Sequence, residues 1–323
     1  MTTPAPALLR FGSFYGRLHS ARQEYTDALA LVFGAGLHPL TPEHDDTRHF
    51  DLTIAEAPTL RSAPAVPEDQ LNRLTLGGTP ERPTVSTDAL HADLRLDQRP
   101  VDIRLTVLRS DVTFPALCVH FGVIIHKILF HCDRLMLHAG AVRVDDAVCL
   151  FVGDKGAGKS TSCLALARAG GTVLGEDQVV LWRSGGKFTV SGNDERSRVT
   201  ERTERHFFVE PLPITPRDFA GTMKKEIAMR DYFKSEPFRD FPPHRLLFPR
   251  VTGEFSLRRL SSQAALRRMM AYNGHFQRFA GARDQAAFLD FLAGFIASVS
   301  CWELTLGEDL SELDTLATRL RDA

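Results

Sequence analysis

A glycine-rich segment at residues 153–161 carries the clearest chemistry of this chain. Gly153, Gly158, Lys159 and Ser160 fit the phosphate-binding pattern G-x-x-x-x-G-K-[ST]. Such glycines let successive backbone N–H groups point into one concavity, and the start of a following helix adds unpaired donors. We expect the lysine to contact the β- and γ-phosphates of a nucleotide and the serine to ligate Mg2+. The predicted nucleotide-binding residues are Gly153, Asp154, Lys155, Gly156, Ala157, Gly158, Lys159, Ser160 and Thr161.

The segments on both sides of this loop predict the elements that would position it. The apolar run Val148–Val152 is typical of a buried parallel strand. The run from Lys159 to Ala169 is rich in Ala and Leu and stops at two glycines, which is typical of a helix. A glycine-rich turn without a ligand is the alternative, but the order strand, loop, helix favours a phosphate site.

Two adjacent carboxylates follow one helix downstream. Glu176 and Asp177 precede the apolar run VVLW, at the edge of a predicted strand. One carboxylate could hold Mg2+ together with Ser160, while the other accepts the proton of an attacking hydroxyl group. We therefore predict Ser160, Glu176 and Asp177 as metal ligands and the two acids as catalytic residues. The alternative is a solvated turn between strands.

Further polar residues are candidates for the same chemistry. His138 comes at the start of the strand region that leads to the loop, where a buried core histidine is the alternative. Lys224 and Lys225, in GTMKKEIAM, could neutralise the charge of a transferred phosphoryl group from a lid. A pair of solvated surface lysines is the alternative.

Composition excludes several classes of function. The chain has 323 residues, 43% of them hydrophobic and 24% charged, and its net charge of −1 argues against a bulk nucleic-acid binder. The apolar window Phe114–Phe130 contains His120, His126 and Lys127, so we expect a core helix and no membrane span. No signal-peptide pattern begins the chain, and its five scattered cysteines are typical of reduced thiols. We expect a cytoplasmic protein.

The order of elements predicts an α/β fold with α+β character. We expect an N-terminal α+β region over residues 1–110, with a substrate-docking or oligomer-forming role, and a catalytic domain over 111–323. Residues 57–100 are expected to be loop or loosely built sheet, and 191–206 an exposed loop. Residues 210–249 form either a lid or a disordered excursion. A homo-oligomer is compatible with this pattern.

The stretch LMLHAGAVRVDDAVCLFVGDKGAGKSTSCLALARAGGTVLGEDQVVL resembles the C-terminal catalytic domain of the HPr serine kinase/phosphorylase family and its shorter relatives. That family shows a His-Gly-type strand, a P-loop and an acidic pair in this order. The resemblance is strongest over 135–183 and weaker over 245–320. It implies a P-loop kinase core related to phosphoenolpyruvate carboxykinase. It also implies phosphate transfer from ATP, with Mg2+, to a serine hydroxyl.

The resemblance also implies roles for single residues. His138 matches the family histidine near the transferred phosphate, and Gly153, Gly156, Gly158, Lys159 and Ser160 match the phosphate loop. Glu176 and Asp177 match a pair that is usually Asp-Asp, and Asp177 is the better match for the base. Lys224 and Lys225 match the basic loop more weakly. A Glu-Ile-Arg-Gly phosphorylase signature is missing from the sequence.

We therefore predict an ATP-dependent kinase whose acceptor is a serine of a peptide or protein. A kinase of a free small-molecule hydroxyl, or a nucleotide-binding regulator without turnover, are the alternatives.

Overall fold

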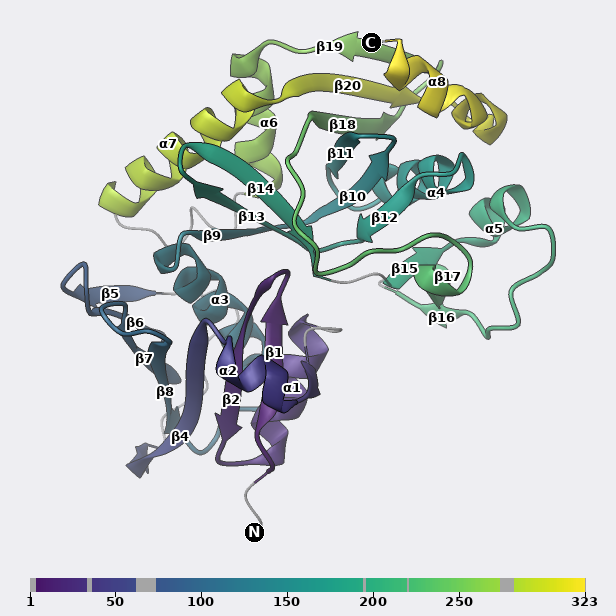
Figure 1. Ribbon diagram of the computed structural model, residues 1–323. Coiled ribbons are helices and arrows are strands. Elements are labelled where there is room, and N and C mark those ends of the chain that lie inside the picture. The colour runs from purple at the N-terminus through teal and green to yellow at the C-terminus, as the bar shows by residue number, and fades with distance from the viewer. Residues whose placement is uncertain are drawn as a thin grey trace. The chain divides into compact units, whose positions relative to one another are not determined.

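The computed structural model describes residues 4–33, 37–61, 74–193, 196–219, 221–273 and 282–322. The chain forms two compact units (Figure 1). Unit 1 comprises residues 1–136 and 275–286, and unit 2 comprises 137–274 and 287–323. Both units combine helices with mixed sheets, so the predicted α/β class is confirmed.

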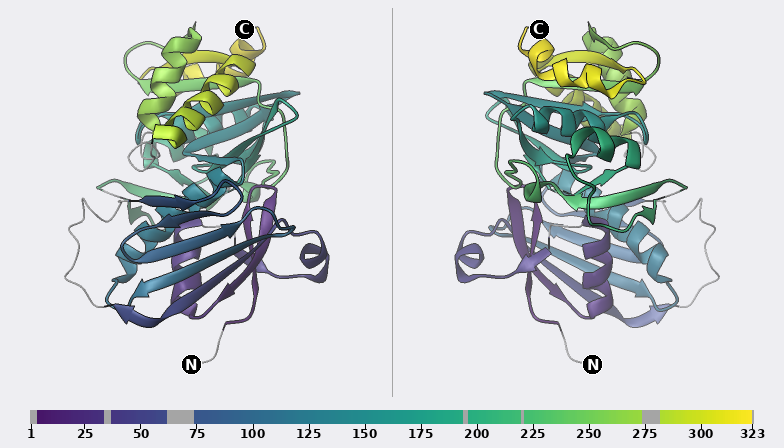
Figure 2. Two further views of the ribbon diagram at one scale, coloured as in Figure 1. Left: turned by 90° about the vertical axis from the view of Figure 1, so that its left-hand side faces the viewer. Right: turned by 90° about the vertical axis from the view of Figure 1, so that its right-hand side faces the viewer.

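Unit 1 is built on one eight-stranded sheet of order β3-β1-β2-β4-β8-β7-β6-β5. Buried and exposed positions alternate along β2 and β8, which is typical of a sheet with one covered face. Helices α1 and α3 pack against each other, and the right-hand view of Figure 2 shows α1 against one face of the sheet. The elements of this unit are β1 (Ala7–Phe11), β2 (Phe14–Ser20), α1 (Gln23–Phe33), β3 (Leu37–Pro39), α2 (Pro42–Asp46), β4 (Phe50–Arg61), β5 (Thr75–Gly78), β6 (Pro83–Ser86), β7 (Leu90–Arg95), β8 (Val101–Arg109), α3 (Phe114–His131) and most of β9 (Arg134–Leu137).

Helix α3 matches its predicted range and belongs to unit 1. It is the one helix in the described ranges that is long and apolar enough to cross a membrane. Its two buried polar side chains each face an acidic side chain of the same unit. Lys127 Nζ lies 2.9 Å from Asp284 Oδ2, and His120 Nε2 lies 3.4 Å from Asp88 Oδ1. The expected core helix is therefore confirmed. Since α3 also packs on β6 and β7, the first segment of unit 1 runs to residue 136, beyond the predicted boundary at 110.

Residues 57–100 contain more regular structure than their turn-rich composition indicates. They include β5, β6 and β7, which pair antiparallel with one another and with β8. Residues 62–73 lie outside the described part. The predicted loosely built sheet is thus an integral part of the unit 1 sheet, because its strands bury apolar residues such as Val85, Leu90 and Leu94.

Unit 2 is built on a six-stranded sheet of order β12-β10-β11-β18-β20-β19 (Figure 1). β11, β18 and β20 run parallel, while β10 and β19 run antiparallel to their neighbours. β13 and β14 form a separate antiparallel hairpin. The elements are β10 (Ala139–Val144), β11 (Ala147–Val152), α4 (Lys159–Arg168), β12 (Thr172–Gly175), β13 (Val179–Ser184), β14 (Lys187–Gly192), β15 (Arg196–Val199), α5 (Glu201–Phe207), β16 (Arg217–Asp218), β17 (Met223–Ala228), a 3-10 turn η2 (Met229–Asp231), β18 (Arg245–Val251), β19 (Ser256–Arg259), α6 (Ser262–Tyr272), β20 (Ser300–Leu306), η4 (Leu310–Thr315) and α8 (Leu316–Arg321). Helix α7 (Ala282–Ser298) begins in unit 1 and continues into unit 2.

The core of unit 2 lies between this sheet and α4. Cys163, Leu164 and Leu166 of α4 are fully buried against apolar residues of β10, β11 and β12. Burying such side chains stabilises the fold by roughly 1.5–3 kcal/mol each relative to exposure. The predicted strand before the loop and the helix after it are both confirmed, as β11 and α4.

Residues 191–206 are not the exposed loop that their charge density predicts. They contain the end of β14, then β15 and most of α5, with 194–195 outside the described part. β15 pairs with β17, and β17 with β16, in a small antiparallel ribbon. We call these three strands the β15–β17 ribbon. The excursion 210–249 supplies two of its strands and part of β18, and residue 220 lies outside the described part.

Glu303 ties three elements of unit 2 together. It lies in β20 and is buried, while Arg258 of β19 and Arg268 of α6 both donate to its carboxylate. Hydrogen bonds from Arg258, then from Arg268, lower the pKa of Glu303 to about 2. This cluster holds the outer strands of the sheet whose inner strands carry the phosphate loop.

We predict that Glu303→Gln lowers the free energy of unfolding by about 2 kcal/mol at neutral pH, allowing for solvent screening at the exposed Arg258. A depressed pKa contributes stability above the unfolded value of 4.5, and that contribution is lost as the pH falls towards 2. Urea unfolding at pH 7, 5 and 3 should therefore show a shrinking difference from the wild type. The matched control is Glu308→Gln, at an exposed residue after β20. A pH-independent deficit would contradict the ion-pair explanation.

Candidate functional site

The phosphate-loop pattern lies at an edge of the six-stranded sheet where several strand ends meet. β11 ends at Val152 directly before the loop, and the parallel strands β18 and β20 end beside it. Gly158 has a left-handed φ of 101°, and a Cβ on it would meet Leu306 Cδ1 of β20 at 2.3 Å. A side chain at position 158 would thus be strained and would clash. The second glycine of the pattern is required by this packing.

Lys159 folds back across the loop that precedes it. Its Nζ donates to the carbonyl oxygens of Gly153 at 2.8 Å and Asp154 at 3.1 Å. Burial lowers the pKa of Lys159, and the charges of Asp177 and Glu176 oppose that shift. The ammonium group therefore lies within the loop, close enough to both acids to be coupled to them.

Glu176 is a buried carboxylate beside the first turn of α4. Only 2% of the residue is exposed, and its Oε2 has no hydrogen-bond partner among the described residues. Burial, followed by the charge of Asp177, raises the pKa of Glu176 to about 7, while the Ser160 hydroxyl, the Cys163 thiol and the charge of Lys159 oppose the rise. A carboxylate with this pKa exchanges protons near neutral pH.

The strand that follows His138 makes room for this carboxylate. A Cβ on Gly140 would lie 2.4 Å from Cys163 Sγ and 3.1 Å from Glu176 Oε2. β10 and β12 are antiparallel neighbours, with Ala141 opposite Gly175, so the start of β10 and the end of β12 reach the same edge. His138, the phosphate loop and the acidic pair are brought together by this topology.

Asp177 occupies the centre of a tight turn and faces a histidine and an arginine side chain. Its φ is 65°, and the N–H of Gln178 donates to the Glu176 carbonyl oxygen at 2.8 Å across it. Such strained turns cluster at functional sites. Asp177 is partly exposed, and its Oδ1 lies 3.9 Å from His138 Nδ1. Burial, then the charge of Lys159, lowers the pKa of His138, so its imidazole is neutral at pH 7.

Two residues at the start of α4 and after β12 offer ligands of the kind that Mg2+ takes. No group of three or more His, Cys, Asp and Glu side chains forms a metal centre in the described part of the chain. Mg2+ commonly takes one or two carboxylates and completes its shell with phosphate oxygens and water. The hydroxyl of Ser160 and the unpartnered Oε2 of Glu176 supply such a partial set, so these residues fit the ion.

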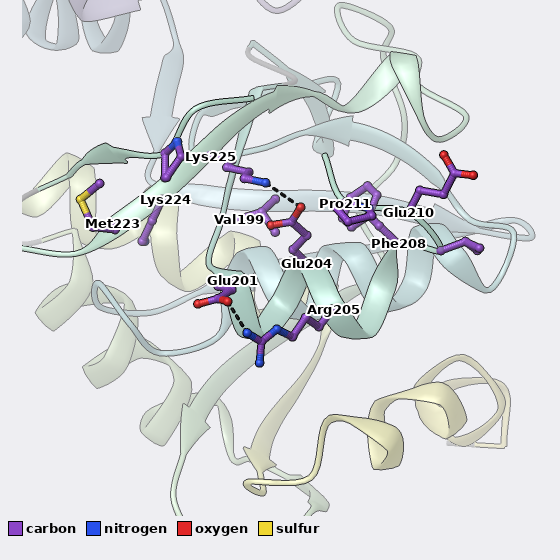
Figure 3. A pocket seen from close by; sticks show the side chains of 12 residues that line it. Val199, Glu201, Glu204, Arg205, Phe208, Glu210, Pro211, Met223, Lys224 and Lys225 are labelled. Carbon is purple, nitrogen blue, oxygen red and sulfur yellow. Dashed lines mark hydrogen bonds and ion pairs between the residues drawn. The ribbon is translucent and has the colours of Figure 1, made fainter. Parts of the chain in front are cut away.

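The two lysines of the predicted basic loop lie on β17 and point to different faces of the β15–β17 ribbon. Lys225 Nζ donates to Glu204 Oε1 and to the Leu212 carbonyl oxygen, both at 2.8 Å (Figure 3). Its ammonium group is therefore engaged by α5 and the following loop, not by the phosphate loop. Both lysines line a pocket of about 580 Å3 beside α5. Their predicted catalytic role stays a prediction.

Sequence reasoning missed one cation at the acids. Arg198 Nη1 of β15 lies 3.5 Å from Asp177 Oδ2. The segment around it is so dense in charge that no single arginine stands out. The only sequence feature that could have indicated it is the short alternation of side chains over residues 196–199. This segment forms a strand by pairing with β17, which is distant in the sequence.

Comparisons with known proteins leave the family open. No family model matches the chain, and no curated protein matches it. Among solved structures, the Hpr(Ser) kinase/phosphatase from Coxiella burnetii matches at 12% identity with a TM-score of 0.30, covering 58% of this chain and 94% of that one. At this TM-score we assign no activity from the match.

We predict that Glu176→Gln changes stability in a pH-dependent way. Because folding raises the pKa of Glu176 from 4.5 to about 7, its contribution to stability is present below pH 4.5 and is lost as the pH rises through 7. The amide variant carries no such titration. The free energy of unfolding of the variant minus that of the wild type should therefore rise by about 3 kcal/mol between pH 4.5 and 8.5, because only the wild type loses stability through this group.

The measurement is urea unfolding of both proteins without nucleotide at several pH values. Glu308→Gln serves again as the exposed control, with an expected flat difference from the wild type. A flat difference for Glu176→Gln as well would show that this carboxylate is not buried as described.

Proposed function

We propose that this chain is an ATP-dependent kinase that transfers the γ-phosphoryl group to a hydroxyl, with a serine of a peptide or protein as the acceptor. The observation that carries the proposal is the meeting of a phosphate loop with two unlike carboxylates at one sheet edge. Glu176 is buried beside Ser160, whereas Asp177 is partly exposed beside His138. Their environments suit different roles.

Each residue has a task in this proposal. The loop and Lys159 hold the β- and γ-phosphates, with Lys159 exchanging its carbonyl partners for phosphate oxygens. Ser160 and Glu176 hold Mg2+, which neutralises charge on the phosphates when bound. Asp177 accepts the proton of the acceptor hydroxyl, because its carboxylate is the accessible one.

The transfer is balanced in atoms and charge. The bond between the γ-phosphorus and its bridging oxygen breaks, and its electron pair leaves with ADP. A bond forms between the γ-phosphorus and the acceptor oxygen, whose proton passes to Asp177. Neutral His138, next to Asp177, is placed to hydrogen-bond the acceptor or the carboxylate. Catalysis is then mainly positioning and electrostatic stabilisation.

We expect Lys159→Met to weaken ATP binding by about 10- to 100-fold, because a charged hydrogen bond to phosphate contributes roughly 1.5–3 kcal/mol. Calorimetric titration with ATP and Mg2+ measures this change. Lys187→Met, at the exposed first residue of β14, should bind as the wild type does. Equal binding by both variants would argue against a nucleotide in this loop.

Phosphate transfer itself is tested with γ-labelled ATP, Mg2+ and two acceptors, a serine-containing peptide and free serine. Asp177→Asn should lower the turnover number by about 100- to 10,000-fold, because it removes the base and leaves the fold intact. Peptide labelling without labelling of free serine supports the proposed acceptor. Labelling of the small molecule alone favours the small-molecule kinase. Tight ATP binding with no transfer and no hydrolysis would favour the regulator instead.

A further inference from the structure

Arg198 is held in a defined position beside the acidic pair. Its Nη1 lies 3.5 Å from Asp177 Oδ2, and its Nε lies 3.2 Å from Glu226 Oε2 on the neighbouring strand β17. Its guanidinium carbon lies 4.6 Å from the ring centroid of Phe219. The side chain is thus fixed by a carboxylate on each side and by an aromatic ring.

We infer that Arg198 is a further catalytic residue, whose guanidinium contacts the transferred phosphoryl group while Asp177 takes the acceptor proton. This inference rests on the proposed kinase function. Asp177 is contacted by His138 on one carboxylate oxygen and by Arg198 on the other, so Arg198 lies at the acid assigned to the acceptor. Lys159 lies within the phosphate loop, and its charge is coupled to that of Asp177.

The donor geometry of Arg198 suits this role. A guanidinium carries five N–H donors in a rigid planar fork that matches phosphate oxygens. The closest contacts with Asp177 and Glu226 use Nη1 and Nε, and Nη2 makes no hydrogen bond with the described residues. A planar phosphoryl group next to Asp177 would find donors there that need little reorganisation.

The platform beneath Arg198 is joined to the phosphate loop. Lys155 Nζ, from the loop, donates to the Phe219 carbonyl oxygen at 3.2 Å. The ring of Phe219 supports the guanidinium through a cation–π contact. The loop that would hold the nucleotide and the arginine that would contact its γ-phosphate are therefore linked through one residue.

The proton transfer to Asp177 favours the interaction of Arg198 with the phosphoryl group during the reaction. When Asp177 accepts the hydroxyl proton, its charge is neutralised and its attraction for Arg198 falls. At the same stage negative charge is spread over the phosphoryl oxygens. The positive charge of Arg198 then has the phosphoryl group as its strongest partner on that side, while Glu226 keeps the fork in place.

A purely structural ion pair between β15 and the acidic turn is the alternative role for Arg198. The chain offers a matched control in Arg196, which lies two residues away on the same strand and also reaches Glu226, at 3.9 Å. Two strand residues span about 6–7 Å, so Arg196 has the charge and the strand of Arg198 but not its position at Asp177.

The experiment compares the wild type with Arg198→Met, Arg198→Lys and Arg196→Met. ATP turnover is measured with the serine peptide, and calorimetry gives the affinity for ADP alone and for ADP with aluminium fluoride, a planar phosphoryl mimic. Arg198→Met should lower the turnover number by about 100- to 1000-fold and remove the affinity gain from aluminium fluoride. The affinity for ADP and the KM for ATP should stay within about threefold of the wild type.

The two companion variants separate the roles. Arg198→Lys should retain part of the rate, because lysine keeps the charge but loses the fork. Arg196→Met should behave as the wild type. Equal losses at positions 196 and 198, or loss of ADP binding in Arg198→Met, would point to a structural role and overturn the inference.

The wild type reports on the proposed function separately. A wild type that transfers phosphate and gains affinity from aluminium fluoride, together with an Arg198→Met variant that does both equally well, would overturn the arginine assignment alone. A wild type that does neither would overturn the kinase proposal and the arginine assignment with it.

Discussion

The convergence of strand ends at one edge of the six-stranded sheet is the constraint on which the site depends. β11, β18 and β20 run parallel and end beside the phosphate loop, and β12 ends at the same edge because β10 runs antiparallel to both β11 and β12. Neighbouring strands lie about 4.8 Å apart, so the acids after β12 lie within two strand spacings of the end of β11. His138, the phosphate loop and the acidic pair therefore reach the same edge of the sheet, although all of them come from one continuous segment, residues 138–177.

Burial then makes the two neighbouring acids unequal. The side chain of Glu176 turns into the space left by Gly140 and becomes a carboxyl group that titrates near neutral pH. The side chain of Asp177, one residue later in a strained turn, meets His138 and Arg198 instead. In the proposed function the buried acid holds the metal ion and the accessible acid takes the proton. Two equally solvated acids would not be distinguished in this way.

The β15–β17 ribbon completes the site from outside the sheet. Arg198 and Glu226 lie on one face of this ribbon, directly opposite each other, while Val199 and Lys225 share the other face. The alternation of a strand therefore decides that the arginine reaches the acids and that Lys225 pairs with Glu204. A shift of β17 by one residue in this register would bring Lys225 to the face of Arg198.

Local patterns were sufficient to predict the strand and the helix on both sides of the glycine-rich loop and the core helix that begins at residue 114, because each is encoded within about twenty residues. They predicted an exposed loop at 191–206, where β15 forms only by pairing with a strand that begins at residue 223. They also grouped Lys225 with the phosphate chemistry; that role stays a prediction, and its ammonium group contacts Glu204 in the structure. The sequence by itself determined which chemical groups this protein has near its phosphate loop. The tertiary structure decided which of them are buried, which face one another, and that Arg198 joins them, because burial and strand pairing are set by residues distant in the chain.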